Sequence, residues 1–190
     1  MRRPAPVLAS LAALIAFGCS QAQSPPPALD VSSERTLAMG AVVGFATANG
    51  AHNWLQIPYA RPPVDQLRWR APQPPESWSG TREALAVGNI CVQLANELDA
   101  PDASPGTAVG SEDCLYLNVH APRFDPDEVP RGDARLPVMV WFHGGGNTIG
   151  SGGFYDGGNL AARQDVVVVT VNYRLGPFGW FRHAALRAGT

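Results

Sequence analysis

Two nearly continuous runs of apolar, β-branched residues constrain the fold more than any other feature of this sequence. One covers residues 136–142 (LPVMVWF) and the other residues 166–173 (VVVVTVNY). Such runs are typical of strands in a parallel sheet that helices cover on both faces, because neither face meets water. A glycine-rich loop and a helical candidate at 158–164 lie between them. We therefore predict a strand, loop, helix and strand, forming one right-handed crossover of an α/β sheet.

Shorter segments predict the rest of the architecture. β-Branched or alternating residues predict short strands at 36–46, 54–59 and 114–119. A proline-rich stretch with tryptophans at 61–80 excludes regular helix over most of its length, and polar loops are expected at 95–110 and 124–135.

The first residues have the pattern of a targeting segment. Arg2 and Arg3 precede a twelve-residue apolar run that ends at Gly18. A membrane-spanning helix needs about 20 residues, so this run suits a signal peptide instead. Cys19 follows in a sequence that resembles a bacterial lipoprotein cleavage box. Lipidation of Cys19 and ordinary cleavage nearby both stay open.

These features divide the chain into three parts. We expect a signal peptide over 1–19, a flexible proline-rich tether over 20–35 and a folded domain over 36–190. The protein is then exported to the periplasm or beyond the cell, and a lipid on Cys19 would attach it to a membrane. The formal net charge of −2, without a basic patch, gives no support for nucleic-acid binding. Nothing in the sequence indicates an oligomeric state.

Three cysteines are present, at positions 19, 91 and 114. If Cys19 is lipidated or removed, Cys91 and Cys114 can pair in an oxidising compartment. Their loop would stabilise the fold by about 3 kcal/mol in the chain-entropy model. The alternative is two buried free thiols.

A loop of three glycines, Gly144–Gly146, follows the first apolar run within WFHGGGNTIGSGG. Successive glycines can aim several backbone N–H groups at one anion, because no Cβ obstructs the approach. Phosphate-binding motifs are absent: there is no G-x-G-x-x-G, and a chain without lysine holds no G-x-x-x-x-G-K. The pattern matches the HGGG loop of lipases and esterases, which binds an oxyanion. A flexible loop without function is the alternative.

The chain resembles the type-B carboxylesterase and cholinesterase-like family over residues 44–181. The matching stretches are IPYARPPVDQLRWRAPQPPESWSG from Ile57, GNICVQ from Gly88, SEDCLYLNV from Ser111, LPVMVWFHGGG from Leu136 and VVVVTVNYRLGPFGWF from Val166. The resemblance implies an α/β-hydrolase fold, of which this chain holds the N-terminal part of the central sheet, without the nucleophile strand and the elements after it.

The resemblance also implies roles for the glycine loop. The family's oxyanion hole uses the backbone N–H groups that correspond to Gly145 and Gly146, with Gly144 in support. His143 would be structural rather than a catalytic base.

Structural pairs follow from the same resemblance. The family's first disulfide corresponds to Cys91 and Cys114, and a buried ion pair corresponds to Arg68 and Glu112. Arg174 is expected to be a structural arginine whose acidic partner lies further along the chain.

Three positions depart from the family pattern. Gln56 and Asp65 stand where the family usually has glycine. Asn147 replaces the common phenylalanine after the glycines, which changes the wall near the acyl pocket.

No nucleophile is found in these 190 residues. None of the ten serines has glycine at both −2 and +2, as the motif G-x-S-x-G requires. The family places the serine, acid and histidine after the region present, so we expect an incomplete copy. Its strand at 136–142 would have an open edge, and the isolated chain would be poorly soluble and inactive.

The expected function of the complete protein is hydrolysis of small carboxylic esters by a serine nucleophile, without metal or cofactor. The alternative is a non-catalytic binding or adhesion protein on the same scaffold. An intact glycine loop favours the enzyme.

Overall fold

The computed structural model describes residues 26–187. The expected signal peptide over 1–19, with Cys19, lies outside the described residues. No helix in the described range is both long and apolar enough to span a bilayer.

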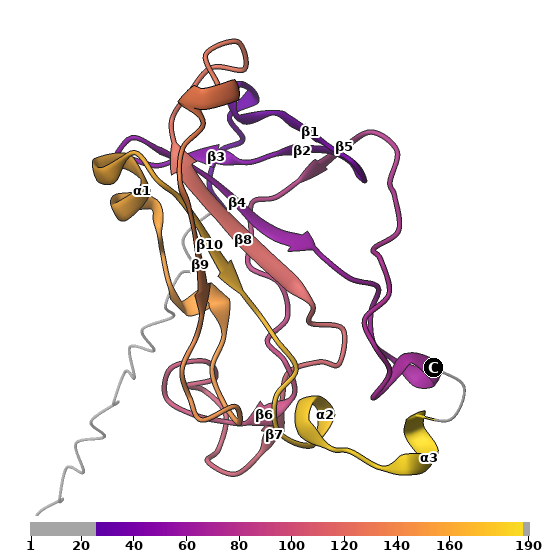
Figure 1. The fold of residues 1–190 in the computed structure, drawn as a ribbon. Coiled ribbons are helices and arrows are strands. Elements are labelled where there is room, and N and C mark those ends of the chain that lie inside the picture. Colours follow the sequence, from indigo (N-terminus) through magenta and orange to yellow (C-terminus); the bar gives the residue numbers. More distant parts are fainter. Residues whose placement is uncertain (1–25, 188–190) are drawn as a thin grey trace, which may run out of the picture.

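A mixed five-stranded sheet forms the centre of the fold, in the order β3-β4-β8-β10-β9 (Figure 1). Its strands are β3 (Phe45–Ala46), β4 (Ala51–Pro58), β8 (Tyr116–Pro122), β9 (Val138–Phe142) and β10 (Val167–Val171). β9 and β10 are parallel, whereas the pairs β3–β4, β4–β8 and β8–β10 are antiparallel. The architecture is therefore α/β.

The predicted strand, loop, helix and strand is present. β9 and β10 pair from Val138 opposite Val167 to Phe142 opposite Val171. Helix α1 (Gly158–Gln164) connects them and packs against β4, β8 and β10. Because α1 covers these three strands, it buries Ala161 and Val168 between helix and sheet.

Smaller elements surround this sheet. A three-stranded sheet contains β1 (Arg35–Leu37), β2 (Gly40–Val43) and β5 (Thr81–Glu83), and a two-stranded one contains β6 (Gln93–Leu94) and β7 (Ala108–Val109). Helices α2 (Gly176–Trp180) and α3 (Ala184–Arg187) follow β10. Single 3₁₀ turns are η1 (Val31–Ser33), η2 (Asp65–Leu67), η3 (Gly132–Ala134) and η4 (Gly152–Phe154). The β6–β7 ladder lies partly inside the segment expected as a loop over 95–110.

The fold begins earlier than the expected tether over 20–35 allows. The Asp30 side chain caps turn η1, and the Asp30 N–H donates to the Gly44 carbonyl at 3.0 Å. Ser33 is fully buried, and its carbonyl accepts a hydrogen bond from the Trp54 indole. Residues 30–35 therefore belong to the folded domain, because their backbone groups find partners in it.

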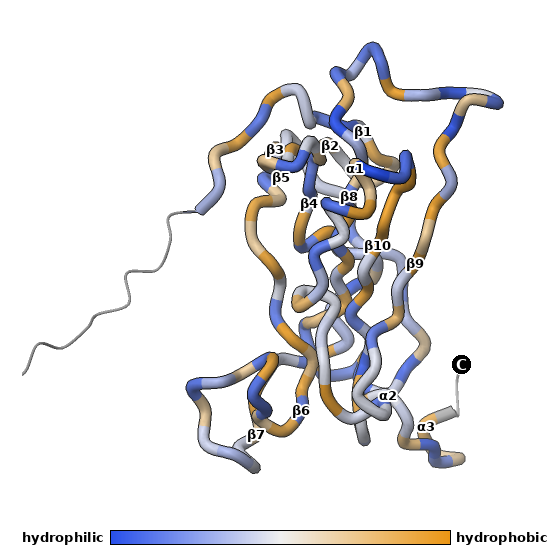
Figure 2. The backbone as a smooth tube through the Cα atoms, turned by 90° about the vertical axis from the view of Figure 1, so that its left-hand side faces the viewer, coloured by the Kyte–Doolittle hydropathy of each residue, from blue (hydrophilic) through white to orange (hydrophobic). Residues whose placement is uncertain are grey.

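The burial of β9 differs from the prediction. Its five side chains, Val138, Met139, Val140, Trp141 and Phe142, are 48–65% exposed. Figure 2 shows β9 as a largely hydrophobic strand at one side of the molecule, beside β10. The prediction of two covered faces is thus wrong for β9 within residues 26–187, because β9 is an edge strand and α1 packs on its neighbours instead.

Candidate functional site

The glycine loop leaves the carboxyl end of β9 at the end of the sheet where β6, β7 and α2 also lie (Figure 1). Gly145 has φ +101° and Gly146 φ +62°, which L side chains rarely adopt. Within residues 26–187 neither backbone N–H of this pair donates a hydrogen bond, and both residues are exposed. Open α/β sheets bind ligands at the carboxyl ends of their strands. These two N–H groups can therefore donate hydrogen bonds to a ligand.

Close packing inside the loop requires glycine at one of the three positions. A Cβ at Gly145 would lie 2.0 Å from the Ile149 carbonyl oxygen. At Gly144 and Gly146 a Cβ would meet nothing within 4 Å. The Gly145 carbonyl in turn accepts hydrogen bonds from the backbone N–H groups of Thr148 and Ile149. Gly145 is thus held against the far end of its own loop.

His143, which precedes the glycine loop, is buried and contacts both Gly144 and Tyr173. It is 4% exposed, and its ring stacks on Tyr173 with a centroid distance of 4.4 Å. The Tyr173 hydroxyl donates to the His143 carbonyl at 2.6 Å, and His143 Nδ1 lies 2.9 Å from the Gly144 carbonyl. These contacts join the glycine loop to Tyr173, which follows β10.

The three departures from the family pattern share one backbone conformation. Gln56, Asp65 and Asn147 all have positive φ, between 48° and 61°. Glycine adopts this conformation without strain, which fits the glycine that the resemblance implies at the first two positions. Asn tolerates it better than most residues, and the Asn147 carbonyl accepts the Gly176 N–H at 2.7 Å. Asn147 therefore fastens the loop to the start of α2.

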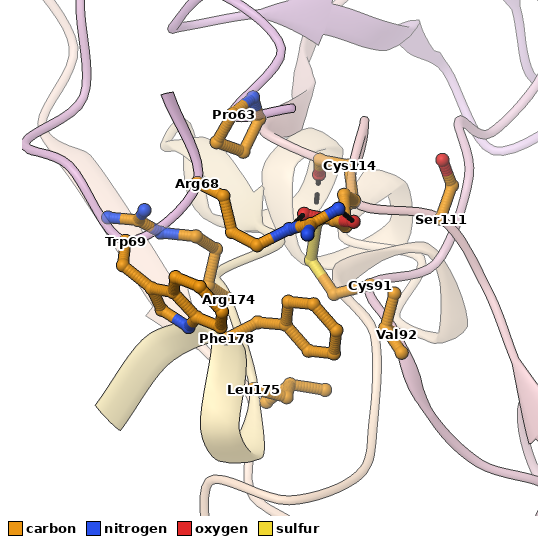
Figure 3. A pocket seen from close by; sticks show the side chains of 11 residues that line it. Pro63, Arg68, Trp69, Cys91, Val92, Ser111, Cys114, Arg174, Leu175 and Phe178 are labelled. Carbon is orange, nitrogen blue, oxygen red and sulfur yellow. Dashed lines mark hydrogen bonds and ion pairs between the residues drawn. A yellow bond between two sulfur atoms is a disulfide. The ribbon is translucent and has the colours of Figure 1, made fainter. Parts of the chain in front are cut away.

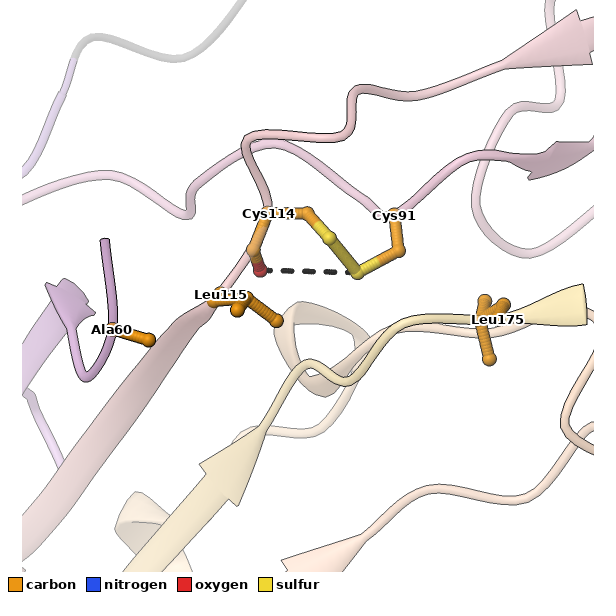
Figure 4. Close-up of a cluster of buried hydrophobic side chains, with 5 residues drawn as sticks. All are labelled: Ala60, Cys91, Cys114, Leu115 and Leu175. Atoms are coloured by element: carbon orange, nitrogen blue, oxygen red, sulfur yellow. Dashed lines mark hydrogen bonds between the residues drawn. A yellow bond between two sulfur atoms is a disulfide. The ribbon is translucent and has the colours of Figure 1, made fainter. Parts of the chain in front are cut away.

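Cys91 and Cys114 form a disulfide. It is buried in a cluster with Ala60, Leu115 and Leu175 (Figure 4). Cys91 precedes β6, and Cys114 precedes β8 of the central sheet. The disulfide therefore attaches the segment between the two cysteines to the end of the sheet that carries the glycine loop.

Arg68 and Glu112 form a two-point ion pair, beside Trp69 and Phe178 (Figure 3). The Arg68 side chain is 38% exposed, so the pair lies near the surface instead of being buried as the resemblance implied. The hydrogen bond to Glu112 raises the pKa of Arg68. Arg174 donates to the carbonyl of Arg70 at 3.0 Å.

A cavity of about 340 Å³ borders Ser151 and Phe154, which follow the glycine loop in the chain. Its wall includes Asp99, Tyr116, Ser151 and Phe154. The Ser151 hydroxyl donates to Asp99 at 2.6 Å, a contact between residues 52 positions apart that no sequence pattern signalled. Burial, with a hydrogen bond to Asp113, raises the pKa of Tyr116 to about 12, so this phenol is neutral at physiological pH. The cavity therefore offers mixed apolar and polar contacts to a small molecule.

Asp30, Ser32 and His52 lie together but do not form a catalytic triad. The Ser32 hydroxyl and the Asp30 carboxylate both approach the same ring atom, His52 Nε2, at 3.3 and 3.2 Å. A triad needs the serine and the acid on different ring nitrogens. His52 also lies at the start of β4, at the opposite end of the sheet from the glycine loop. Burial lowers its pKa, although Asp30 opposes this.

Comparison of the sequence and the fold with known proteins identifies the family of this chain. The model of the Carboxylesterase family matches residues 31–188. The para-nitrobenzyl esterase of Bacillus subtilis is 48% identical over 147 residues, covering 76% of this chain and 28% of that protein. Liver carboxylesterase 1 of Oryctolagus cuniculus is 41% identical over 181 residues, covering 92% of this chain and 30% of that protein.

Solved structures agree. A para-nitrobenzyl esterase structure superposes with a TM-score of 0.69 at 44% identity, over 83% of this chain and 31% of that one. A carboxylesterase of Geobacillus stearothermophilus gives 0.64 at 36% identity, with the same two shares. The chain spans less than a third of the length of these relatives. On the family match, the identities and the shared fold, this chain belongs to the carboxylesterase family.

Proposed function

We propose that this chain supplies the oxyanion-hole region of a serine carboxylic ester hydrolase. The observation that carries the proposal is the pair of exposed N–H groups of Gly145 and Gly146, free of partners within residues 26–187, after the carboxyl end of β9. When a serine attacks an ester carbonyl, the oxygen becomes negatively charged, and two such donors can stabilise it. Each donor of this kind typically lowers the barrier by about 3 kcal/mol.

The remaining machinery would come from sequence outside these 190 residues. A serine in G-x-S-x-G, an acid and a histidine would form and then hydrolyse the acyl-enzyme, with water as the second nucleophile. The 190 residues alone are expected to show no ester hydrolase activity, because an oxyanion hole without a nucleophile has no intermediate to stabilise. Export through residues 1–19, with or without lipid on Cys19, belongs to the same proposal.

The substrate class follows from the relatives and the cavity. The relatives carry the names para-nitrobenzyl esterase, cocaine esterase and pyrethroid hydrolase, so their substrates have little in common beyond the ester. The cavity that borders Ser151 combines Phe154 with the polar groups of Tyr116, Ser151 and Asp99. We therefore propose a small carboxylic ester as the substrate.

A chimera tests this proposal directly. Residues 26–187 would replace the aligned segment of the Bacillus subtilis para-nitrobenzyl esterase, which brings the nucleophile with it. We expect the chimera to hydrolyse para-nitrobenzyl esters. Gly145→Ala should reduce kcat/KM at least about 100-fold, because the new Cβ would displace Ile149 and the oxyanion donor.

Gly106→Ala, between β6 and β7, is the matched control, since its φ of +83° is also positive but its Cβ meets open space outside the glycine loop. It should keep kcat/KM within about threefold of the parent. A folded but inactive chimera, or equal activity of the two variants, would overturn the proposal. Sequencing the source DNA beyond the Thr190 codon separates the enzyme from the binding protein: serine in an in-frame G-x-S-x-G supports the enzyme, and another residue there supports the binder.

A further inference from the structure

Gln93, on β6, uses the full hydrogen-bonding capacity of its side-chain amide. The side chain is buried, with the residue 5% exposed. Its Oε1 accepts from the Gly150 N–H at 2.7 Å and from the Asn96 side-chain amide at 3.1 Å. Its Nε2 donates to the carbonyls of Gly150 at 3.0 Å and Cys91 at 3.1 Å. Two donors and two acceptors are all that a glutamine amide offers.

The bond from the Gly150 N–H holds a peptide plane that packs directly against the oxyanion loop, and the bond to the Gly150 carbonyl holds the next peptide unit. The Gly150 N–H belongs to the peptide unit that also contains the Ile149 carbonyl, and such a unit is planar. If Gly145 had a Cβ, that Cβ would lie only 2.0 Å from this carbonyl oxygen. When Gln93 holds the N–H side of the plane, it also sets the position of the oxygen that confines Gly145.

We propose that Gln93 is a positioning residue for the oxyanion hole. It touches no reacting atom and acts through the Ile149–Gly150 peptide, which holds the Gly145 N–H in its orientation. The inference rests on the proposed function. An amide is required because both Gly150 bonds must form together: a reversed amide would set N–H against the Gly150 N–H and oxygen against the Gly150 carbonyl.

Two variants in the chimera test this role. Gln93→Met keeps the length and removes all four hydrogen bonds. Gln93→Glu keeps the acceptor for the Gly150 N–H but sets a carboxylate against two carbonyls. We expect kcat to fall about 10- to 100-fold in both, with KM changed less than about threefold, because the hole acts on the transition state more than on the bound ester. Asn96→Ala removes four side-chain hydrogen bonds, none of which involves Gly150. It is the matched control and should keep kcat within about threefold.

The pH profile separates positioning from a merely structural role. A protonated carboxyl has one O–H donor and one acceptor, so it can imitate the amide. Burial raises the pKa of a carboxyl. The ratio of kcat in Gln93→Glu to kcat in the parent should therefore rise as the pH falls, whereas the ratio for Gln93→Met should stay flat. A structural defect would give both variants the same flat ratio.

Amide hydrogen exchange provides a measurement that needs no activity. Exchange of the hydrogen-bonded amides of residues 148–150, measured by mass spectrometry in the 190-residue chain and in the chimera, should speed up at least about 10-fold in Gln93→Met and stay unchanged in Asn96→Ala. Unchanged exchange and kcat in Gln93→Met would overturn the role of Gln93. If the parent chimera is inactive, the proposed function fails, and the exchange rates still decide whether Gln93 holds the loop.

Discussion

β9 and β10 are neighbouring parallel strands of similar composition, yet their surroundings differ. β10 has partners on both sides and α1 against it, so that Val168 is 6% exposed. β9 has a partner on one side, and Val140, directly opposite Val169, is 51% exposed. An apolar run therefore indicates that a strand needs covering elements on its faces and edges. Of these two strands, only β10 has them within residues 26–187.

The largest expected effect is on β10. Val168→Ala should lower the free energy of unfolding of the 190-residue chain by about 2 kcal/mol, because it leaves a cavity under α1. Val140→Ala should lower it by less than about 0.5 kcal/mol, since that side chain already meets water. Urea denaturation at low protein concentration measures both. In the chimera the Val140→Ala loss should exceed about 1 kcal/mol, and equal losses for Val140 in both backgrounds would break the comparison.

Acid should destabilise the buried side of the sheet. Burial lowers the pKa of His120 below the ordinary 6.5, although Asp156 opposes this. The unfolded chain then binds a proton that the folded chain rejects, so stability is complete above about pH 6.5 and is lost as the pH falls toward the folded-state pKa. His120→Asn should reduce this acid sensitivity in melting curves at pH 7 and pH 5.

A smaller gain is expected at Asp65, in the surface turn η2. With φ +48° it bears the strain that glycine avoids. Asp65→Gly should raise the free energy of unfolding by about 0.5 kcal/mol. Asp65→Ala removes the same carboxylate without relieving the backbone, so its melting temperature should not rise. A rise in both variants would assign the gain to charge.

Val140→Arg should change stability least and solubility most. A charge on the exposed edge strand opposes edge-to-edge pairing between chains. We expect a higher soluble fraction in a centrifugation assay of the 190-residue chain. Val31→Arg adds the same charge at a valine that is 75% exposed outside the sheet, and should leave the fraction unchanged. Equal improvement would show that net charge alone controls solubility.

Much of this fold could be predicted because local patterns encode it. The strand within 166–173 follows from its continuous run of apolar, β-branched residues, and the helical candidate at 158–164 lies between two such runs. The glycine loop follows from its composition. The bonds between Gln93 and Gly150 join residues 57 positions apart, one on β6 and one in the loop after β9, so no local pattern reveals them. The open edge of β9 was predicted from the family resemblance. The exposure of its faces was not, because a sequence run cannot show which covering elements are present. The positive φ at Gln56 and Asp65 did leave a signal, since both replace a usual glycine.

The bare edge of β9 has a consequence for the order of synthesis. Ribosomes add about 5–20 residues per second. In any polypeptide where this region precedes a strand that pairs with β9, β9 is therefore made before its partner. Every hundred residues of delay therefore leaves Trp141, Phe142 and their neighbours on β9 in water for roughly 5–20 seconds. Over that interval the nascent chain presents a binding site for chaperones, and the time needed to translate the partner strand determines how long that site stays open.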